Sequence, residues 1–376
     1  MGWLHRWQED SEPWGYNPPM PSRRLPRLLP LLLVLVSFSG ARFAGGLHAA
    51  DGLPSRLSDD EFWHLLSSFS ERAGTFPSDN LLSNETALQQ VIPDLTQRIA
   101  PGGVYLGVGP EQNFTYMTAL RPRMAFIFDI RRGNLALHLI YKALFEMSAD
   151  RLEFLSRLFA RRRPAGLAST ASVADMFDAL SKEESTESLY VENVRAVVNH
   201  LTKKHTFVLD AGDLLRLQHD YRAFHLYGPK IQYSSSRNEG PRGGEPTYSD
   251  LMVATDGAGA MRAYLTTDES FQFLKRLEID NLVVPLVGNF SGPKAIRAVG
   301  AYLRENGATV SVFYVSNVEE YLRQDGVWAN FCANVASLPI DESSTFIRSV
   351  RGRTPSGVFT LHSSLESIGA TIKDCQ

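Results

Sequence analysis

The chain has 376 residues, of which 44% are hydrophobic and 21% charged, a composition typical of a folded globular protein. Its 38 basic and 41 acidic residues give a formal net charge of -3, which argues against a nucleic-acid-binding protein that works through bulk positive charge. The length can hold a large core, as one large α/β domain or as two small domains.

The first 50 residues differ from the rest of the chain. Met20 offers a second possible start, followed by three arginines and then by the apolar stretch 28–38. That stretch is shorter than the roughly 20 residues of a membrane span, but a basic segment before a short apolar one is typical of a signal peptide. We therefore expect residues 1–50 to be an extension with a signal peptide and residues 51–376 to be an exported domain, periplasmic or secreted. The alternative is a membrane anchor formed by residues 28–41.

Cys332 and Cys375 are the two cysteines of the chain. In an oxidising compartment they could pair, although the apolar surroundings of Cys332 are equally compatible with a buried free thiol. No histidine cluster lies near them. His219 and His225 follow a run of acids, but their spacing does not bring ligands together, so we expect no metal site.

The hydrophobic pattern predicts helices alternating with strands along residues 51–376. The expected helices begin at Ser58 as an N-cap and then cover residues 85–99, 114–120, 134–147, a segment capped by Ser148, 191–203, 268–277, 293–305 and 318–323. The expected strands cover residues 104–108, 124–130, 206–209, 281–287, 309–315 and 358–361. This alternation predicts a single α/β domain with a doubly wound, mostly parallel sheet and a helical N-terminal cap.

Three segments need a separate interpretation. Residues 164–190 are small, polar and acidic, and we expect them to form a surface insertion. Residues 233–248 are rich in turn formers and predict a long loop, either a mobile lid or a connection. Pro285 lies inside an expected strand, which favours an edge or a bulge at that position.

A glycine-rich turn follows the first expected strand. Glycines such as Gly107 and Gly109 let the backbone approach a ligand closely, and the next helix presents its N-terminus to it. Asp129 ends the following strand, where a carboxylate can accept hydrogen bonds from ribose hydroxyls. Gln112 stands where dinucleotide-binding proteins have a third glycine, so the pattern favours an adenosine-type ligand over a dinucleotide.

These residues resemble the motifs of the class I S-adenosylmethionine-dependent methyltransferases. The run Leu106-Gly107-Val108-Gly109-Pro110 looks like their first motif, and Phe126-Ile127-Phe128-Asp129 looks like their second-strand acid. The resemblance implies a Rossmann-like fold of methyltransferase type and S-adenosylmethionine as cofactor. It would place Gly107 and Gly109 beside the methionine and ribose parts and Asp129 on the ribose. Glu111 would lie near the methionine amine or cap the helix.

The resemblance extends to a possible catalytic residue. Asn289 follows the strand of residues 281–287, at the position of the fourth-strand motif, and is a candidate catalytic residue by position. Arg131 and Arg132 follow Asp129 after a single residue and could bind an anionic substrate or lie on the surface. Working methyltransferases usually have an acid two residues before the first glycine, where this chain has Tyr105.

A closer resemblance is to an uncharacterised bacterial exported family, over roughly residues 55–360. It rests on the runs 105–116, 129–132, 287–294 and 313–319. This resemblance implies a methyltransferase-like fold without assigning an activity.

Three functions remain open at this point. The first is S-adenosylmethionine-dependent methyl transfer to an unknown substrate, by positioning alone because no strong base is visible. The second is an exported, non-catalytic binding protein that retains a Rossmann-like pocket, since fold does not fix function. The third, a nicotinamide-dependent oxidoreductase, lacks the third glycine. We expect a small-molecule ligand, no nucleic acid, and membrane contact only through the signal segment.

Overall fold

The computed structural model describes residues 52–235, 245–353 and 359–375. The predicted signal peptide and the alternative anchor lie outside these residues, as does most of the predicted loop 233–248. Residues His48–Gln376 form one compact unit. Within the described ranges, no helix is long and apolar enough to cross a membrane.

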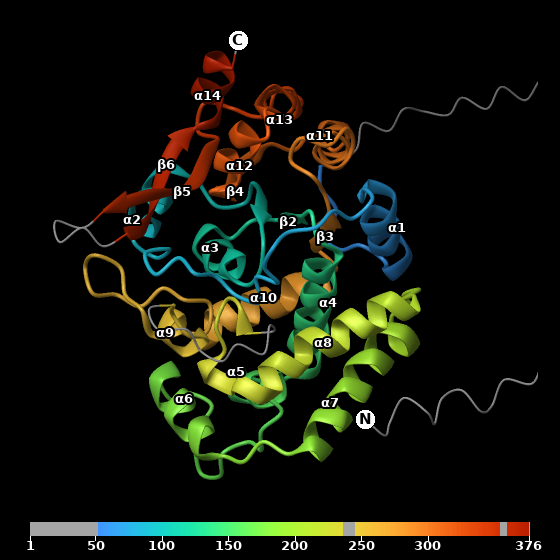
Figure 1. The fold of residues 1–376 in the computed structure, drawn as a ribbon, viewed down its shortest axis with the longest axis vertical. Helices are drawn as coiled ribbons and strands as arrows, with labels where there is room; N and C mark the ends of the chain where they lie inside the picture. The colour runs from blue at the N-terminus through green and yellow to red at the C-terminus, as the bar shows by residue number, and fades with distance from the viewer. Residues whose placement is uncertain (1–51, 236–244, 354–358, 376) are drawn as a thin grey trace, which may run out of the picture. The chain divides into compact units, whose positions relative to one another are not determined.

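The centre of the structure is a six-stranded sheet with the strand order β3-β2-β1-β4-β5-β6 (Figure 1). Neighbouring strands run parallel except β6, which pairs antiparallel with β5. This arrangement confirms the expected α/β fold with a mostly parallel, Rossmann-like sheet. The strands are β1 (Val104–Val108), β2 (Met124–Asp129), β3 (Val283–Val287), β4 (Val310–Ser316), β5 (Thr345–Arg353) and β6 (Phe359–Ser367).

Helices cover both faces of the sheet because its inner strands are apolar on both sides. β2 and β3 are buried along their whole length, as parallel strands between two helical layers must be. One face carries α11 (Ala295–Glu305) and α13 (Trp328–Val335), and the other carries α3 (Gln112–Leu120) and α4 (Arg132–Met147) (Figure 1). Phe313 of β4 stacks on Phe290 at 5.5 Å between ring centroids, on the α11 side.

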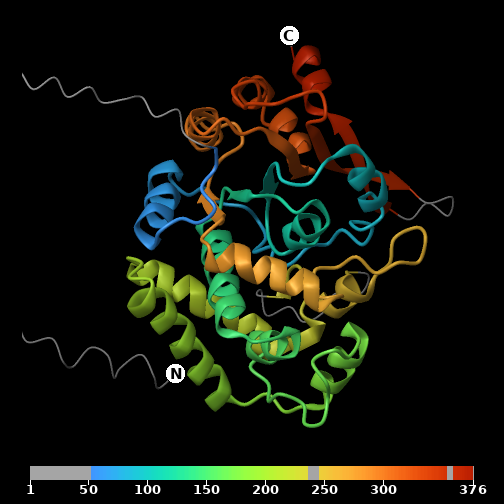
Figure 2. The same ribbon diagram turned by 180° about the vertical axis from the view of Figure 1, so that it is seen from behind.

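A second layer of helices lies beyond α4 and is inserted between β2 and β3 (Figures 1 and 2). It packs through aromatic rings, such as Phe145 of α4 on Phe154 at 4.6 Å between centroids. Its helices are α5 (Arg151–Leu158), α6 (Val173–Lys182), α7 (Glu187–Asn199), α8 (Ala211–Tyr227), α9 (Tyr248–Val253) and α10 (Asp268–Ile279). The prediction of a surface insertion at 164–190 was therefore wrong, because α6 buries Met176 and Leu180 in this layer.

The N-terminal helices agree with the sequence in one case and differ in the other. Ser58 caps α1 (Asp59–Phe69) through a reciprocal capping box with Glu61, as predicted. The expected helix 85–99 is shorter, since α2 covers only Ile92–Arg98. Residues preceding it form turns because Glu85 turns inward to accept hydrogen bonds from β4.

Two other boundaries were wrong. Ser148 follows α4, and the cap of α5 is Asp150, whose carboxylate accepts a hydrogen bond from the Glu153 amide at 2.8 Å. Residues 206–209 form no strand, because Thr206 has a left-handed φ of 57° that breaks an extended run. Pro285 lies in the edge strand β3, where its missing N–H leaves no gap in the sheet.

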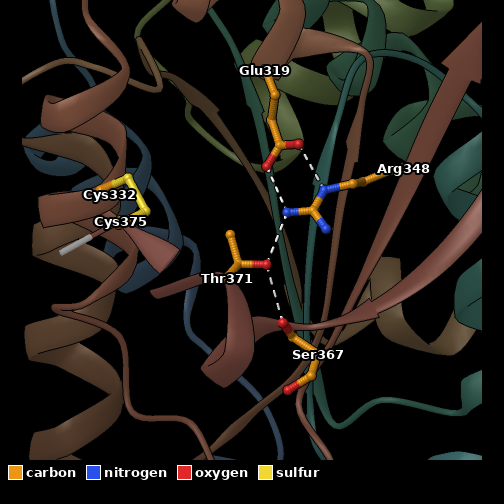
Figure 3. The surroundings of a disulfide bond; sticks show 6 residues. All are labelled: Glu319, Cys332, Arg348, Ser367, Thr371 and Cys375. Atoms are coloured by element: carbon orange, nitrogen blue, oxygen red, sulfur yellow. Dashed lines mark hydrogen bonds and ion pairs between the residues drawn. A yellow bond between two sulfur atoms is a disulfide. The ribbon is translucent and has the colours of Figure 1, made fainter. Parts of the chain in front are cut away.

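Of the elements that follow β4, only α12 (Val318–Gln324) and the start of β6 were predicted from the sequence. A disulfide joins Cys332 of α13 to Cys375, which follows α14 (Ile368–Asp374) (Figure 3). Beside it, Arg348 of β5 donates hydrogen bonds to Glu319 at 2.6 and 2.8 Å and to Thr371 at 3.0 Å. The disulfide therefore joins the residue after α14 to α13, which packs on the sheet.

Replacing both cysteines by serine should lower the free energy of unfolding by about 2–4 kcal/mol, because the bond restricts a 43-residue loop in the unfolded chain. Urea unfolding of the double variant and the wild type measures the difference. Unfolding of the wild type in a reductant is the matched control and should give the same loss. Equal midpoints for all three would contradict a structural role for the bond.

Candidate functional site

The predicted site lies at the carboxyl ends of the parallel strands. The sheet reverses its order between β1 and β4, and open α/β sheets bind ligands in the crevice at such a switch point. The turn of Gly107 and Gly109 follows β1, and Asp129 ends the adjacent β2. The structure thus brings the predicted cofactor residues to one edge, and what surrounds each of them decides what they can do.

The side chain of Asn113 packs against Gly107. A Cβ on Gly107 would lie 1.9 Å from the Asn113 Oδ1 atom, so only glycine fits there. Asn113 accepts a hydrogen bond from the Tyr105 hydroxyl at 2.8 Å, and its amide nitrogen lies 2.7–3.2 Å from three carbonyls of the turn. Gly109 has a φ of 79°, a conformation that favours glycine. The space left by the missing Cβ of Gly107 is therefore filled by the Asn113 side chain.

Replacing Gly107 by alanine should cost about 1–3 kcal/mol of stability through overpacking against Asn113. Thermal or urea unfolding measures this loss. Gly133→Ala is the matched control, because a Cβ at Gly133 in α4 would meet no atom within 4 Å. The control should be neutral or slightly stabilising. A Gly107→Ala protein as stable as Gly133→Ala would show that Asn113 does not fill this space.

Asp129 is fully engaged by the arginine that follows it. Its Oδ1 atom accepts hydrogen bonds from the Arg131 backbone amide at 2.8 Å and from Nε at 2.9 Å, and Oδ2 accepts from Nη2 at 2.6 Å. Both side chains are buried, with 6% and 10% of their surfaces exposed. Burial opposes the charge of Arg131, but Asp129 outweighs it and raises the pKa of the guanidinium. A ribose would have to displace the Arg131 side chain before it could bind Asp129.

The other predicted substrate and catalytic residues are also engaged within the chain. Arg132 makes a two-pronged pair with Asp213 of α8, at 2.5 and 2.7 Å. Asn289 accepts hydrogen bonds from the amide and the hydroxyl of Ser291, both at 3.0 Å, and so shapes its own turn. Arg132 thus contacts α8, whereas Asn289 contacts its own loop after β3.

One segment of the chain, residues 70–85, crosses the whole carboxyl edge of the sheet; we refer to it as the covering segment. Its amides at Glu71 and Gly74 donate to the carbonyls of Val287 at the end of β3 and Ile130 after β2, both at 2.8 Å. The Ser83 amide donates to Glu111 at 3.3 Å, beyond β1. At its far end Glu85 contacts β4. The covering segment thus occupies the edge where the predicted ligand would lie.

The Glu71 carboxylate lies in the loop between β3 and α11. Its Oε1 atom accepts hydrogen bonds from the amides of Lys294 and Ala295, both at 2.8 Å, and Oε2 accepts from the Asn289 amide at 3.2 Å. A Cβ on Gly292 would lie 2.2 Å from the same carboxylate. Backbone amides at a helix N-terminus favour anions, and here the anion is a side chain of the covering segment.

Glu111 and His138 lie beneath the glycine turn, where burial controls both pKa values. Burial raises the pKa of Glu111 to about 8, although amide hydrogen bonds partly oppose it. Burial also lowers the pKa of His138 to about 4, so this ring is neutral at pH 7. His138 Nε2 lies 2.9 Å from the Gly109 carbonyl and supports the turn from below. Glu111 forms no side-chain cap for α3.

A buried polar cluster adjoins the turn at the ends of β1 and β4. Gln112 donates to the Tyr314 hydroxyl at 3.1 Å, and Tyr314 in turn donates to Glu85 Oε1 at 2.6 Å. Burial raises the pKa of Glu85, and neighbouring hydroxyls offset part of that rise. Among the described residues, the buried atoms Glu85 Oε2, Gln112 Oε1, Tyr116 Oη and Ser349 Oγ make no hydrogen bond. The cluster keeps unused hydrogen-bonding capacity.

Space for a small molecule lies farther along the same edge. A cavity of about 370 Å³ opens at the ends of β4 and β5, beside the disulfide, and its lining includes Ser316 and Ser349. The lining charges are those of Glu319, Glu320, Arg323, Arg348, Glu366 and Asp374. Arg348 is already paired with Glu319 and Glu366, so its charge is compensated within the chain.

Sequence analysis missed three of the residues that shape this site: Glu71, Glu85 and Asn113. Glu71 and Glu85 bind partners distant in sequence, and Asn113 donates hydrogen bonds to carbonyls of the preceding turn. Hydrophobic periodicity carries no information about such contacts. One signal was available: Gly292 lies in the run 287–294, and a glycine leaves room there for a close partner, which is Glu71.

A protein-family model, the Domain of unknown function (DUF7790), matches residues 81–222 and 243–371. The match covers most of the chain, which therefore belongs to this family. The model describes no activity, so the likeness to methyltransferases stays a prediction. No curated protein matches the chain.

Proposed function

We propose that this member of the DUF7790 family is an exported, non-catalytic binding protein of Rossmann-like fold whose adenosine-type crevice is closed by its own chain. The observation that carries the proposal is the covering segment. It follows the carboxyl ends of β3, β2, β1 and β4 and places Glu71 in the loop before α11. A ligand bound as in other open α/β sheets would need this same edge.

The pairing of the predicted ligand residues supports the proposal. Asp129 holds Arg131 where a ribose would bind, and Asn113 fills the space that Gly107 leaves. These contacts are buried, so a ligand would have to compensate for breaking them before gaining affinity. The covering segment leaves a different space open for a small ligand, the 370 Å³ cavity beside β4 and β5.

The disulfide supports the exported location. Disulfides persist in oxidising compartments and are rare in the cytosol. The pairing of Cys332 with Cys375 is therefore the state expected after export. An exported protein also leaves the compartment in which S-adenosylmethionine is made, which favours a binding role over methyl transfer.

A second candidate is an S-adenosylmethionine-dependent methyltransferase that opens by releasing the covering segment. The observation that favours it is the buried polar cluster: Glu85 and Gln112 keep acceptor oxygens without hydrogen bonds in the described structure, next to the glycine turn. Such acceptors suit the ammonium group of a methionine moiety. In this candidate Arg131 and Arg132 would bind an anionic substrate and Asn289 would act at the methyl group.

Isothermal titration calorimetry with S-adenosylmethionine and its demethylated product, S-adenosylhomocysteine, separates the two. We expect no heat of binding for the wild type. Glu71→Ala loosens the covering segment and tests whether closure alone prevents binding. Binding to the wild type with a stoichiometry near one would reject the closed crevice and support the methyltransferase. Binding only to Glu71→Ala would show a working adenosine site beneath the segment.

A further inference from the structure

A cluster of two histidines and a glutamate lies apart from the crevice, where three helical elements meet. Glu146 belongs to the last turn of α4, and His200 and His205 border the short π-helix that extends α7. The ligand atoms of these three side chains lie within 4.8 Å of one another. We propose that Glu146, His200 and His205 form a binding site for a divalent transition metal of the zinc class.

The π-helix is what brings the two histidines together. The His205 amide donates to the His200 carbonyl at 3.2 Å, which is the i to i+5 bond of a π-turn. The two rings consequently lie edge to face, at 5.1 Å between centroids. π-Turns are rare and occur frequently at functional sites. In a regular α-helix, residues five apart point in different directions.

Both nitrogens of the His205 ring face carboxylates. Nδ1 lies 2.8 Å from Asp59 Oδ1, and Nε2 lies 2.8 Å from Glu146 Oε2. An ionised carboxylate only accepts hydrogen bonds, and a neutral imidazole has a single N–H to donate. Nε2 is thus the nitrogen that a metal shared with Glu146 would bind, and Nδ1 is the nitrogen that Asp59 would hold.

The surroundings match a metal site in detail. His200 Nε2 approaches the same Glu146 oxygen at 2.9 Å. Metal-bound histidines commonly donate their other N–H to a carboxylate, as His205 does to Asp59, which Asn281 holds at 2.9 Å. Zinc bonds of roughly 2.0–2.1 Å place ligand atoms about 3.3 Å apart, so each histidine nitrogen needs to move only a few tenths of an ångström away from Glu146 Oε2.

Two lysines also contact Glu146 and set the charge. Lys142 is buried and lies 2.9 Å from Oε1, leaving Oε2 for a metal. Lys204 lies 2.9 Å from Oε2, but 59% of its side chain is exposed and it can swing into solvent. Replacing the Lys204 ammonium by a divalent ion adds only one positive charge beside Glu146.

Titration of the full-length chain with Zn²⁺ alone tests the site, after treatment with a chelator and without a polyhistidine tag. We expect one equivalent to bind, with Co²⁺ giving visible absorption from the same site. Asp59→Asn should weaken binding 10–100-fold. Lys204→Met should tighten it, because the competing ammonium is removed.

His200→Gln should abolish stoichiometric binding while the far-ultraviolet circular dichroism spectrum stays unchanged. His219→Gln is the matched control, since His219 is an exposed histidine of α8 outside the cluster, and it should bind like the wild type. The proposal is overturned if neither the wild type nor Lys204→Met binds one equivalent, or if His200→Gln retains it.

Discussion

Replacing Arg131 by methionine is expected to lower the free energy of unfolding by about 3–5 kcal/mol, because it leaves a buried carboxylate without its partner. Asp129 accepts two hydrogen bonds from the Arg131 guanidinium and has only 6% of its side chain exposed. The third hydrogen bond, from the Arg131 backbone amide, remains in the variant. Arg131 also lowers the pKa of the nearby buried Asp220, although burial still raises that pKa well above its ordinary value. Its loss therefore affects two acids at once.

The matched control for Arg131→Met is Lys182→Met, which removes an exposed ion pair with Asp178. Exposed pairs contribute roughly 0–1 kcal/mol, so the control should unfold like the wild type in urea. The double variant Asp129→Asn/Arg131→Met should recover part of the loss, because it removes the unpaired charge. A single variant that costs less than about 1 kcal/mol would contradict the buried pair.

Replacing Glu111 by glutamine should flatten the dependence of stability on pH between pH 4.5 and 8. The pKa of Glu111 is about 8 in the folded protein and 4.5 ordinarily. Within this window the folded chain keeps a proton that the unfolded chain releases, so wild-type stability falls as pH rises. Each pKa unit corresponds to about 1.4 kcal/mol, which sets a ceiling of roughly 5 kcal/mol on the loss.

Urea unfolding of both proteins at pH 5, 6, 7 and 8 measures this difference. Glu278 also has a pKa raised by burial to about 8, so the variant should keep part of the decline. His138 acts in the opposite direction, because its lowered pKa reduces stability as pH falls below 6.5. Glu184→Gln, at an exposed position, is the control and should parallel the wild type. Parallel curves for Glu111→Gln would show that Glu111 is ionised in the folded protein.

Much of the fold could be predicted from local patterns. The apolar runs that became β1, β2 and β3 are short and bounded by turn residues, and Ser58 with Glu61 gives a capping box that is visible in sequence. Pro285 predicted an edge or a bulge, because proline removes a donor from the sheet, and β3 is an edge strand. In each case the determining interactions lie within a few residues.

The missed parts depend on tertiary contacts. β5 is buried continuously from Thr345 to Ser349, and Arg348 can be buried there because Glu319 and Glu366 compensate its guanidinium. Residues 164–190 are small and polar in sequence, yet α6 within them packs into the helical layer. Gly107, Gly109 and Asp129 lie at one edge of the sheet, as their spacing predicted. Spacing could not show that Asn113, Arg131 and the covering segment occupy that edge.

The most direct test of the closed crevice is a crystal structure of the full-length protein grown with excess S-adenosylhomocysteine. We expect residues 70–85 to lie along the sheet edge and Glu71 to accept hydrogen bonds from the amides of Lys294 and Ala295. Asp129 should stay paired with Arg131, with no nucleoside between them. An adenosine resting on the Gly107–Gly109 turn, with its ribose on Asp129 and Arg131 displaced, would contradict the account.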